Sequence, residues 1–155
     1  MLFYAGIDPG QNGAIAIVNE RQEIADIFDF DINTLEGSLT TYPLSFCFCE
    51  KVSAMPGQGV SSTFKFGVDF GIVQGFLYAL KIPHQFVRPQ EWQKGLFSKT
   101  DGDKKKRGLA VVRRMFPSSS YFKREKDHDR ADAVLIALFC VSKKLSALEI
   151  QSCQI

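Results

Sequence analysis

The chain has 155 residues, a length that corresponds to one domain. With 45% hydrophobic and 23% charged residues, its composition is that of a globular protein and excludes disordered and collagen-like chains. The formal net charge is +2, but residues 1–50 hold eight acidic side chains and one basic one, whereas residues 51–155 hold nine acidic and eighteen basic ones. This asymmetry favours a polyanionic partner, although a solvated charged face would give the same pattern.

The cysteine pattern predicts free thiols. The four cysteines form no CxxC pair, and two histidines are too few for a zinc cluster of Cys and His ligands. They are Cys47, Cys49, Cys140 and Cys153. No basic segment followed by an apolar stretch opens the chain, and no apolar run reaches the ~18 residues of a membrane span. We therefore expect buried thiols in a reducing compartment, with no secretion and no membrane partner.

Apolar segments of strand length occur in the first third of the chain. Residues 2–7 and 14–18 flank the turn-forming residues 8–13, which predicts a β-hairpin. Residues 22–30 predict a third strand and residues 44–49 a fourth.

The rest of the chain predicts helices around one more strand. The expected elements are a helix at 60–80, a strand at 84–88, a short helix at 90–96, and helices at 105–115 and 128–145, with polar loops at 98–107 and 117–127. Meandering strands followed by strand–helix–strand–helix units predict an α/β layer fold with a mixed sheet. Residues 1–147 would form a single domain and residues 148–155 a short C-terminal tail.

The helix at 60–80 carries two stripes. The apolar stripe consists of Phe66, Phe70, Val73 and Leu77. The second stripe has no side chains and consists of Gly67, Gly71 and Gly75. A glycine inside a helix costs about 1 kcal/mol relative to alanine, so three in register indicate the close approach of another backbone. That backbone belongs either to the protein's own sheet or to a second subunit.

Four acidic residues stand where strand ends and a helix start would meet. Asp8 and Glu50 each follow an apolar strand, and the carboxyl ends of parallel strands share one edge of a sheet. Asp129 and Asp132 lie at i, i+3 near the start of the last helix and share one face. Packing of that helix beside the two strand ends would bring four carboxylates together.

Each acid also has a simpler interpretation. Asp8 before Pro-Gly could form only a turn, and Glu50 could simply end its strand. Asp129 and Asp132 could be acids favoured by the helix dipole. His128 could reach the same site as a ligand or proton-transfer group, or face solvent at the helix start.

Convergent carboxylates repel one another, and divalent cations relieve that repulsion. Oxygen ligands suit Mg²⁺ or Mn²⁺, and two such ions about 3.5–4 Å apart can hydrolyse a phosphodiester by in-line displacement. An acidic metal site surrounded by lysines and arginines is therefore typical of a metal-dependent nuclease.

Taken together, these motifs resemble RuvC-type Holliday junction resolvases. They are Gly6-Ile7-Asp8-Pro9-Gly10 with Gly13 behind it, Glu50 after a strand, and Asp127-His128-Asp129-Arg130-Ala131-Asp132-Ala133 opening the last helix. The resemblance covers residues 1–145 in order and spacing. The segment Ala54-Met55-Pro56-Gly57-Gln58-Gly59, running on to Gly67, is closer to the phage and plant-organellar branch than to the housekeeping bacterial one.

The resemblance implies an RNase H-like fold with a five-stranded mixed β-sheet flanked by α-helices. It implies a Mg²⁺-dependent endonuclease, with two ions per active site, that resolves four-way branched DNA by paired symmetric nicks during recombination and repair. A homodimer would match the symmetry of the junction, with Gly67, Gly71 and Gly75 at the subunit contact. Such a protein suits the cytoplasm of a bacterial or phage-infected cell, or an organellar matrix, and its helicase partner is not indicated.

The acids match the family position by position, with two departures. Asp8, Glu50, Asp129 and Asp132 match its metal-binding acids, and His128 competes with Asp129 because some relatives use a His near that position. Housekeeping members carry an aromatic residue soon after the second acid, whereas Lys51-Val52-Ser53-Ala54-Met55-Pro56 follow it here. The residue that touches the junction centre is therefore not identified.

Basic side chains outside the acidic site would bind phosphates. The candidates are Lys51, Lys65, Lys99, Lys104, Lys105, Lys106, Arg107 and Lys126. Three other functions compete with junction resolution. They are cleavage of RNA–DNA hybrids or flaps by a related nuclease, a non-catalytic junction-binding dimer, and a fragment of an actin-like kinase, whose second lobe a chain of 155 residues lacks.

Overall fold

The computed structural model describes residues 1–51, 53, 57, 59–97 and 106–152, and its centre is a five-stranded sheet. In spatial order the strands are β3 (Ile24–Asp29), β2 (Ala14–Asn19), β1 (Phe3–Asp8), β4 (Leu44–Glu50) and β5 (His84–Val87). The first three form an antiparallel meander, whereas β4 runs parallel to β1 and β5 parallel to β4. The expected five-stranded mixed sheet is confirmed.

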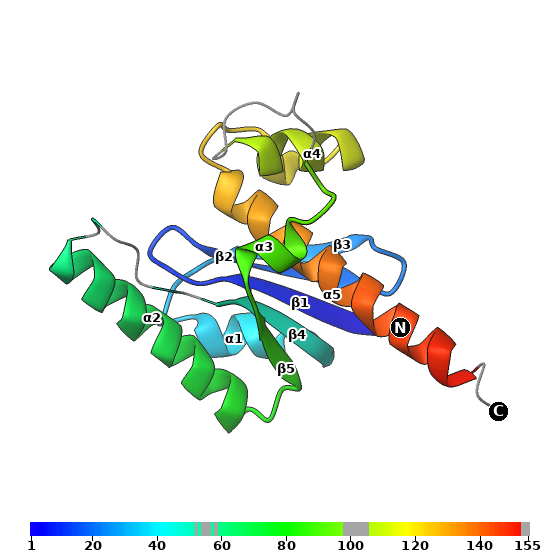
Figure 1. Ribbon diagram of the computed structural model, residues 1–155, viewed down its shortest axis with the longest axis horizontal. Helices are drawn as coiled ribbons and strands as arrows, with labels where there is room; N and C mark the ends of the chain where they lie inside the picture. The colour runs from blue at the N-terminus through cyan, green and yellow to red at the C-terminus, as the bar shows by residue number, and fades with distance from the viewer. Residues whose placement is uncertain (52, 54–56, 58, 98–105, 153–155) are drawn as a thin grey trace.

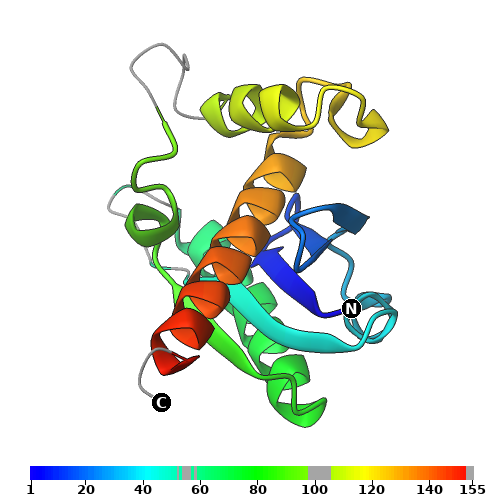
Figure 2. The same cartoon turned by 90° about the vertical axis from the view of Figure 1, so that its right-hand side faces the viewer.

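Helices cover both faces of this sheet (Figure 1). α1 (Leu35–Thr40) and α2 (Val60–Ala79) lie on one face, and α5 (His128–Ser152) crosses the other, as Figure 2 shows from the side. The remaining helices follow β5. They are α3 (Pro89–Trp92), α4 (Arg107–Met115) and the short 3₁₀ helix η1 (Ser120–Phe122), and the last two pack against α5.

The sheet separates two apolar layers because successive side chains of a strand point to opposite faces. Ile15 and Ile17 of β2 pack in the layer with Leu77 of α2. Ala14 and Ala16 of the same strand face the α5 layer. Small side chains on that face allow α5 to lie close to the sheet.

α5 approaches the sheet most closely at Gly6 in the middle of β1. A Cβ atom on Gly6 would overlap the backbone of Ala133 and Ala137. A glycine is therefore required at this position of β1, because any side chain would push the helix away. This contact fixes the first turns of α5 beside the carboxyl end of β1, where Asp8 lies.

The structure differs from the sequence-based expectations in four elements. The short helix expected at 90–96 is α3, which ends at Trp92, so residues 93–96 lie in a bend and turn. α1 is not predicted by the sequence, because six residues are too few to show a helical period, and its buried Leu35 and Leu39 hold it in place. Within the expected loop at 117–127, the 3₁₀ helix η1 forms. α5, expected to end at residue 145, continues to Ser152, so residues 148–152 of the expected tail belong to the helix.

The expected state of the cysteines holds for those that the structure describes. Cys47, Cys49 and Cys140 are buried free thiols, and burial raises the pKa of each. Cys153 lies outside the described residues. Nowhere in the described part of the chain is there a helix long and apolar enough to cross a membrane.

Candidate active site

Asp8 and Glu50 end two neighbouring parallel strands at the same edge of the sheet. Asp8 is the last residue of β1 and Glu50 the last residue of β4. The register pairs Ile7 with Cys49, the residues immediately before the two acids. Both carboxylates are partly buried, so they are shielded but reachable. The parallel pairing of β1 with β4 thus brings together two acids that lie far apart in the sequence.

Asp129 and Asp132 approach this edge from α5. They belong to the first turns of that helix and are partly buried. Burial raises the pKa of Asp8 well above its ordinary value, and the negative charges of Glu50, Asp132 and Asp129 raise it further. All four predicted acids therefore lie within electrostatic range of one another.

The pKa values of the other three acids are also raised. Burial first, and then the charges of Glu50 and Asp129, raise the pKa of Asp132 to about 7, against the opposing effect of Arg107. Burial also raises the pKa values of Glu50 and Asp129. The hydrogen bond with Trp92 opposes this rise at Glu50, and interaction with His128 opposes it at Asp129. The clustered carboxylates thus carry negative charge that nearby cationic side chains only partly compensate.

Trp92 positions Glu50 and was not predicted as a site residue. Its indole Nε1 donates a hydrogen bond to Glu50 Oε2 at 2.7 Å, and the side chain is 1% exposed. It ends α3, the short helix that follows β5, and β5 pairs Val87 with Glu50. The single tryptophan in the chain was the only available signal, since an indole N–H needs a partner when it is buried.

Arg107 and Gly108 bring the start of α4 against Asp132. The Arg107 guanidinium donates to Gln93 Oε1 at 3.0 Å and lies 4.2 Å from the centroid of the Phe97 ring. Gly108 leaves room for the carboxylate, because a Cβ atom there would overlap Asp132 Oδ1. Arg107, a candidate phosphate ligand from the sequence, is therefore also the arginine that lowers the pKa of Asp132.

His128 lies beside Asp129 at the start of α5. Its Nδ1 is 3.1 Å from Asp129 Oδ1, so the two residues that compete for the role of ligand are hydrogen-bonded partners. Asp127, just before them, has both of its carboxylate oxygens directed to Arg124. That carboxylate accepts hydrogen bonds from the backbone N–H and the guanidinium of Arg124, and these bonds lower its pKa despite burial.

Four carboxylates are a donor set that suits Mg²⁺ or Mn²⁺, and a divalent ion would neutralise the charge that raises the pKa values of Asp8 and Asp132. Within residues 1–51, 53, 57, 59–97 and 106–152, no three His, Cys, Asp or Glu side chains stand close enough together to hold one ion as they are. Glu50 and Asp129 are instead turned to Trp92 and His128. The set fits the ion chemically, and these side chains would turn to reach it.

The predicted phosphate ligands are dispersed around this edge. Lys51 and Lys126 are exposed, and Lys65 is exposed with its Nζ donating to Gln11 Oε1 at 2.9 Å. Lys106 forms an exposed ion pair with Glu125 at 3.6 Å. The other three candidates lie outside the described residues, and they are Lys99, Lys104 and Lys105.

A polar hollow of about 400 Å³ adjoins the acids on the side of the β1–β2 turn. Lys126, His128 and Asp129 line it from the start of α5, and Asn12 and Gly13 line it from the turn. Lys126 is thus a predicted phosphate ligand whose exposed side chain lines the same hollow as Asp129.

The glycine stripe of α2 is open in the single chain. A Cβ atom on Gly67, Gly71 or Gly75 would meet no atom within 4 Å, so packing of the stripe on the protein's own sheet is wrong. Large apolar side chains beside the stripe are also exposed. They are Val60 at 87%, Phe64 at 74%, Val68 at 43% and Tyr78 at 64%. The apolar stripe on the opposite side faces the sheet as predicted, with Val73 and Leu77 fully buried.

Comparison with known proteins rests on structure. No protein-family profile matches the sequence, and no curated protein does. RuvC of Thermus thermophilus in complex with a Holliday junction substrate superposes with a TM-score of 0.67 at 15% identity, covering 94% of this chain and 96% of that one. The fowlpox virus Holliday junction resolvase gives 0.58 at 18% identity, covering 92% and 99%. The yeast mitochondrial resolvase gives 0.54 at 16%, covering 89% and 78%.

These structures confirm the expected fold over nearly the whole chain. The helices and the mixed sheet that carry the four acids correspond to those of RuvC at a sequence identity of only 15%. The chain therefore has the RNase H-like fold of the RuvC-type Holliday junction resolvases.

Proposed function

We propose that this protein is a divalent-metal-dependent endonuclease that resolves four-way branched DNA by paired symmetric nicks. The observation that carries the proposal is the convergence of Asp8, Glu50, Asp129 and Asp132 at one sheet edge, in a fold shared with resolvases. The basic character of residues 51–155 complements the phosphate backbone of such a substrate.

In this proposal the four carboxylates hold Mg²⁺, two ions per active site, with Mn²⁺ able to substitute. When bound, the ions would activate water and stabilise the leaving oxygen of the phosphodiester. Trp92 holds one Glu50 oxygen, and Arg107 favours the charged form of Asp132. His128, whose Nδ1 lies 3.1 Å from Asp129 Oδ1, is the alternative ligand at the edge of the site. Lys126 would bind a phosphate beside the scissile one.

A homodimer formed through α2 would supply two such sites. The open glycine stripe allows close backbone approach, and the exposed Phe64 and Val68 supply apolar surface that a partner helix would bury. Two sites related by a two-fold axis would match the symmetry of the junction and produce paired nicks.

A cleavage assay tests the proposed activity. Labelled four-way DNA, linear duplex, flap and RNA–DNA hybrid are each incubated with Mg²⁺ and with EDTA. We expect symmetric paired nicks on the four-way DNA alone, and none in EDTA. Faster cleavage of the hybrid or flap would assign the site to a different substrate, and binding of the junction without cleavage in Mg²⁺ or Mn²⁺ would leave a non-catalytic binding protein.

Replacing Trp92 with Phe should raise the Mg²⁺ concentration required for half-maximal cleavage. The phenyl ring of the variant is apolar but has no N–H to hold Glu50 Oε2. We therefore expect the required Mg²⁺ concentration to rise about tenfold or more, as is typical when a residue that orients a metal ligand is lost. The measurement is the initial cleavage rate against Mg²⁺ concentration. A purely structural role for Trp92 predicts a lower maximal rate with an unchanged Mg²⁺ requirement.

The metal-free protein should become less stable as the pH rises from about 4 to about 7. The Asp132 carboxyl has a pKa of 3.8 in its ordinary state and about 7 in the fold, so between these values the folded chain keeps a proton that the unfolded chain releases. The free energy of unfolding then falls by about 1 kcal/mol per pH unit for this group. Urea titrations at pH 5 and pH 7 measure the slope, which should be smaller for Asp132→Asn and after addition of Mg²⁺. An equal slope in Asp132→Asn would contradict the assignment.

A further inference from the structure

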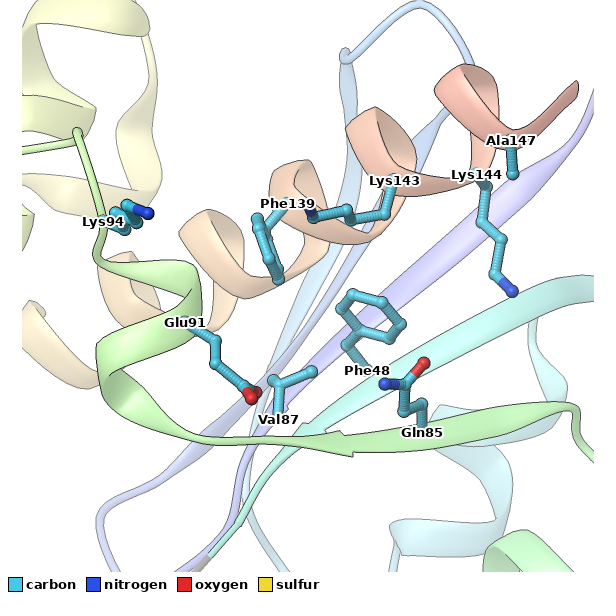
Figure 3. Close-up of a pocket in the computed structure, with 9 residues that line it drawn as sticks. All are labelled: Phe48, Gln85, Val87, Glu91, Lys94, Phe139, Lys143, Lys144 and Ala147. Carbon is cyan, nitrogen blue, oxygen red and sulfur yellow. The ribbon is translucent and has the colours of Figure 1, made fainter. Parts of the chain in front are cut away.

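A second cavity, of about 470 Å³, lies between α5 and the β4–β5 side of the sheet. Figure 3 shows side chains from β4, β5, α3 and the C-terminal half of α5 around it. None of its lining residues is a predicted acid or phosphate ligand. Along α5, Lys143 lies about 21 Å beyond Asp129 at the helical rise of 1.5 Å per residue. The lysine end of the cavity therefore lies apart from the proposed active site, whereas its Val87 end adjoins Glu50 across the β4–β5 pair.

The floor of this cavity is apolar. Phe48 of β4 and Val87 of β5 are 3% and 2% exposed, and the Phe139 ring of α5 lies with its centroid 5.6 Å from that of Phe48. In Figure 3 these two rings stand at the centre of the hollow, one from the strand and one from the helix. Such a floor suits an aromatic or aliphatic side chain.

The rim of the cavity is basic. Lys94, Lys143 and Lys144 line it, and none of the three forms an ion pair among the described residues. The single acid in the lining, Glu91, uses its Oε2 to accept the backbone N–H of Arg88 at 2.8 Å. Three ammonium groups thus face one carboxylate, and the net positive charge of the lining complements an anionic ligand.

Lysine ammonium groups at this rim rest on aromatic rings. Lys144 Nζ lies 3.2 Å from the centroid of the Phe46 ring, and Lys143 Nζ lies 5.3 Å from that of Phe139. These contacts hold two positive charges beside the apolar floor. A ligand would thus meet apolar and cationic groups next to each other.

The neighbouring strand offers a backbone edge. β5 is the last strand of the sheet, and it pairs with β4 on one side only within the part of the chain that the structure describes. Gln85 and Val87 of this strand line the cavity. An extended peptide beside β5 could continue the sheet and place a side chain over the floor.

We propose that this cavity binds an extended acidic peptide of a partner protein, with one aromatic or aliphatic side chain on the Phe48–Phe139 floor and carboxylates at Lys94, Lys143 and Lys144. Charge complementarity and the apolar floor together favour this ligand. Duplex DNA would use the lysines but leave the apolar floor empty, because its backbone presents phosphates and sugars. The proposal does not depend on the nuclease activity.

Fluorescence polarisation tests this site with a labelled synthetic twelve-residue peptide, in which aspartates surround one leucine–phenylalanine pair. Two control peptides carry serines in place of the pair or lysines in place of the aspartates. The full-length chain is compared with a charge-reversed variant, Lys94→Glu with Lys143→Glu, and with Ala147→Trp, which fills the cavity from an exposed position of α5. Lys81→Glu, an exposed lysine at the end of α2, is the matched control.

We expect saturable binding of the acidic peptide, at least tenfold weaker binding to both cavity variants, and unchanged binding to Lys81→Glu. The serine peptide should bind at least tenfold more weakly, and cleavage of four-way DNA by the cavity variants should equal that of the wild type. Absence of binding, or equal binding to all variants, would overturn the proposal. Oligothymidine binding that the cavity variants alone abolish, without any peptide binding, would instead make the cavity a surface for single-stranded DNA.

Discussion

The Asp8→Asn variant should bind four-way DNA like the wild type but cut it at least about a thousandfold more slowly, a loss of about 4 kcal/mol of transition-state stabilisation. The reason lies in the position of Asp8 at the centre of the acidic group, where the three other acids act on its pKa. An amide is a poorer ligand for a divalent ion than a carboxylate, so the proposed metal site would lose one of its four carboxylate ligands. Single-turnover cleavage in Mg²⁺ and junction binding in EDTA measure the two quantities separately.

The same variant should be more stable than the wild type at pH 8 in EDTA. The raised pKa means that the ionised Asp8 carboxylate destabilises the fold, and an amide removes that charge without leaving a large cavity. Asp31→Asn is the matched control and should change neither property, because this acid is exposed and an amide oxygen can accept the same hydrogen bonds from Asn33. Cleavage by Asp8→Asn at the wild-type rate would show that the proposed site is wrong.

The Gly71→Glu variant should convert a dimer into a single folded chain. In the isolated chain a side chain at this position meets nothing within 4 Å, and replacing a helical glycine should stabilise α2 by about 0.5–1 kcal/mol. In the proposed dimer the same glutamate would be buried against the partner helix without a counter-ion, and such a charge costs several kcal/mol. We therefore expect the dimer to dissociate at least about a hundredfold more readily while the monomer gains stability.

Sedimentation equilibrium and urea denaturation measure these opposite effects. The matched control is Gly37→Glu on α1, another exposed helical glycine with open space around it, which should stabilise the chain without changing its association. On four-way DNA, the Gly71→Glu protein should produce single nicks in place of paired ones. A dimer that persists in Gly71→Glu would place the subunit contact elsewhere on the molecule.

Strand and helix positions were largely predictable because their signals are local. Apolar segments between turn residues mark β1, β2 and β4, and the helical spacing of Phe66, Phe70, Val73 and Leu77 marks the buried side of α2. α1 could not be predicted in this way, since six residues hold too little periodicity. The end of α5 was also missed, because a charged and mixed sequence such as Ser142–Leu145 does not by itself stop a helix.

The acids of the proposed site could be named from the sequence, but their surroundings could not. Asp8 and Glu50 stand out because each ends an apolar strand, and Asp129 and Asp132 because they share one face of the first turns of a helix. The hydrogen bond from Trp92 to Glu50 joins residues 42 positions apart, and no local pattern reports such a pair. The same holds for the cavity between Phe48 and Phe139, whose walls come from separate strands and helices.

By itself, the sequence determined the order of the elements, the apolar face of each and the identity of the acids, because these properties depend on neighbours a few residues apart. The tertiary structure alone decided which acids meet, since that depends on the parallel pairing of β1 with β4 and on the approach of α5 to Gly6. It also decided that the glycine stripe of α2 is open rather than packed on the sheet. The stripe of glycines indicates only that another backbone can approach α2 closely. Whether that backbone belongs to the same chain or to a second subunit depends on contacts across the whole fold.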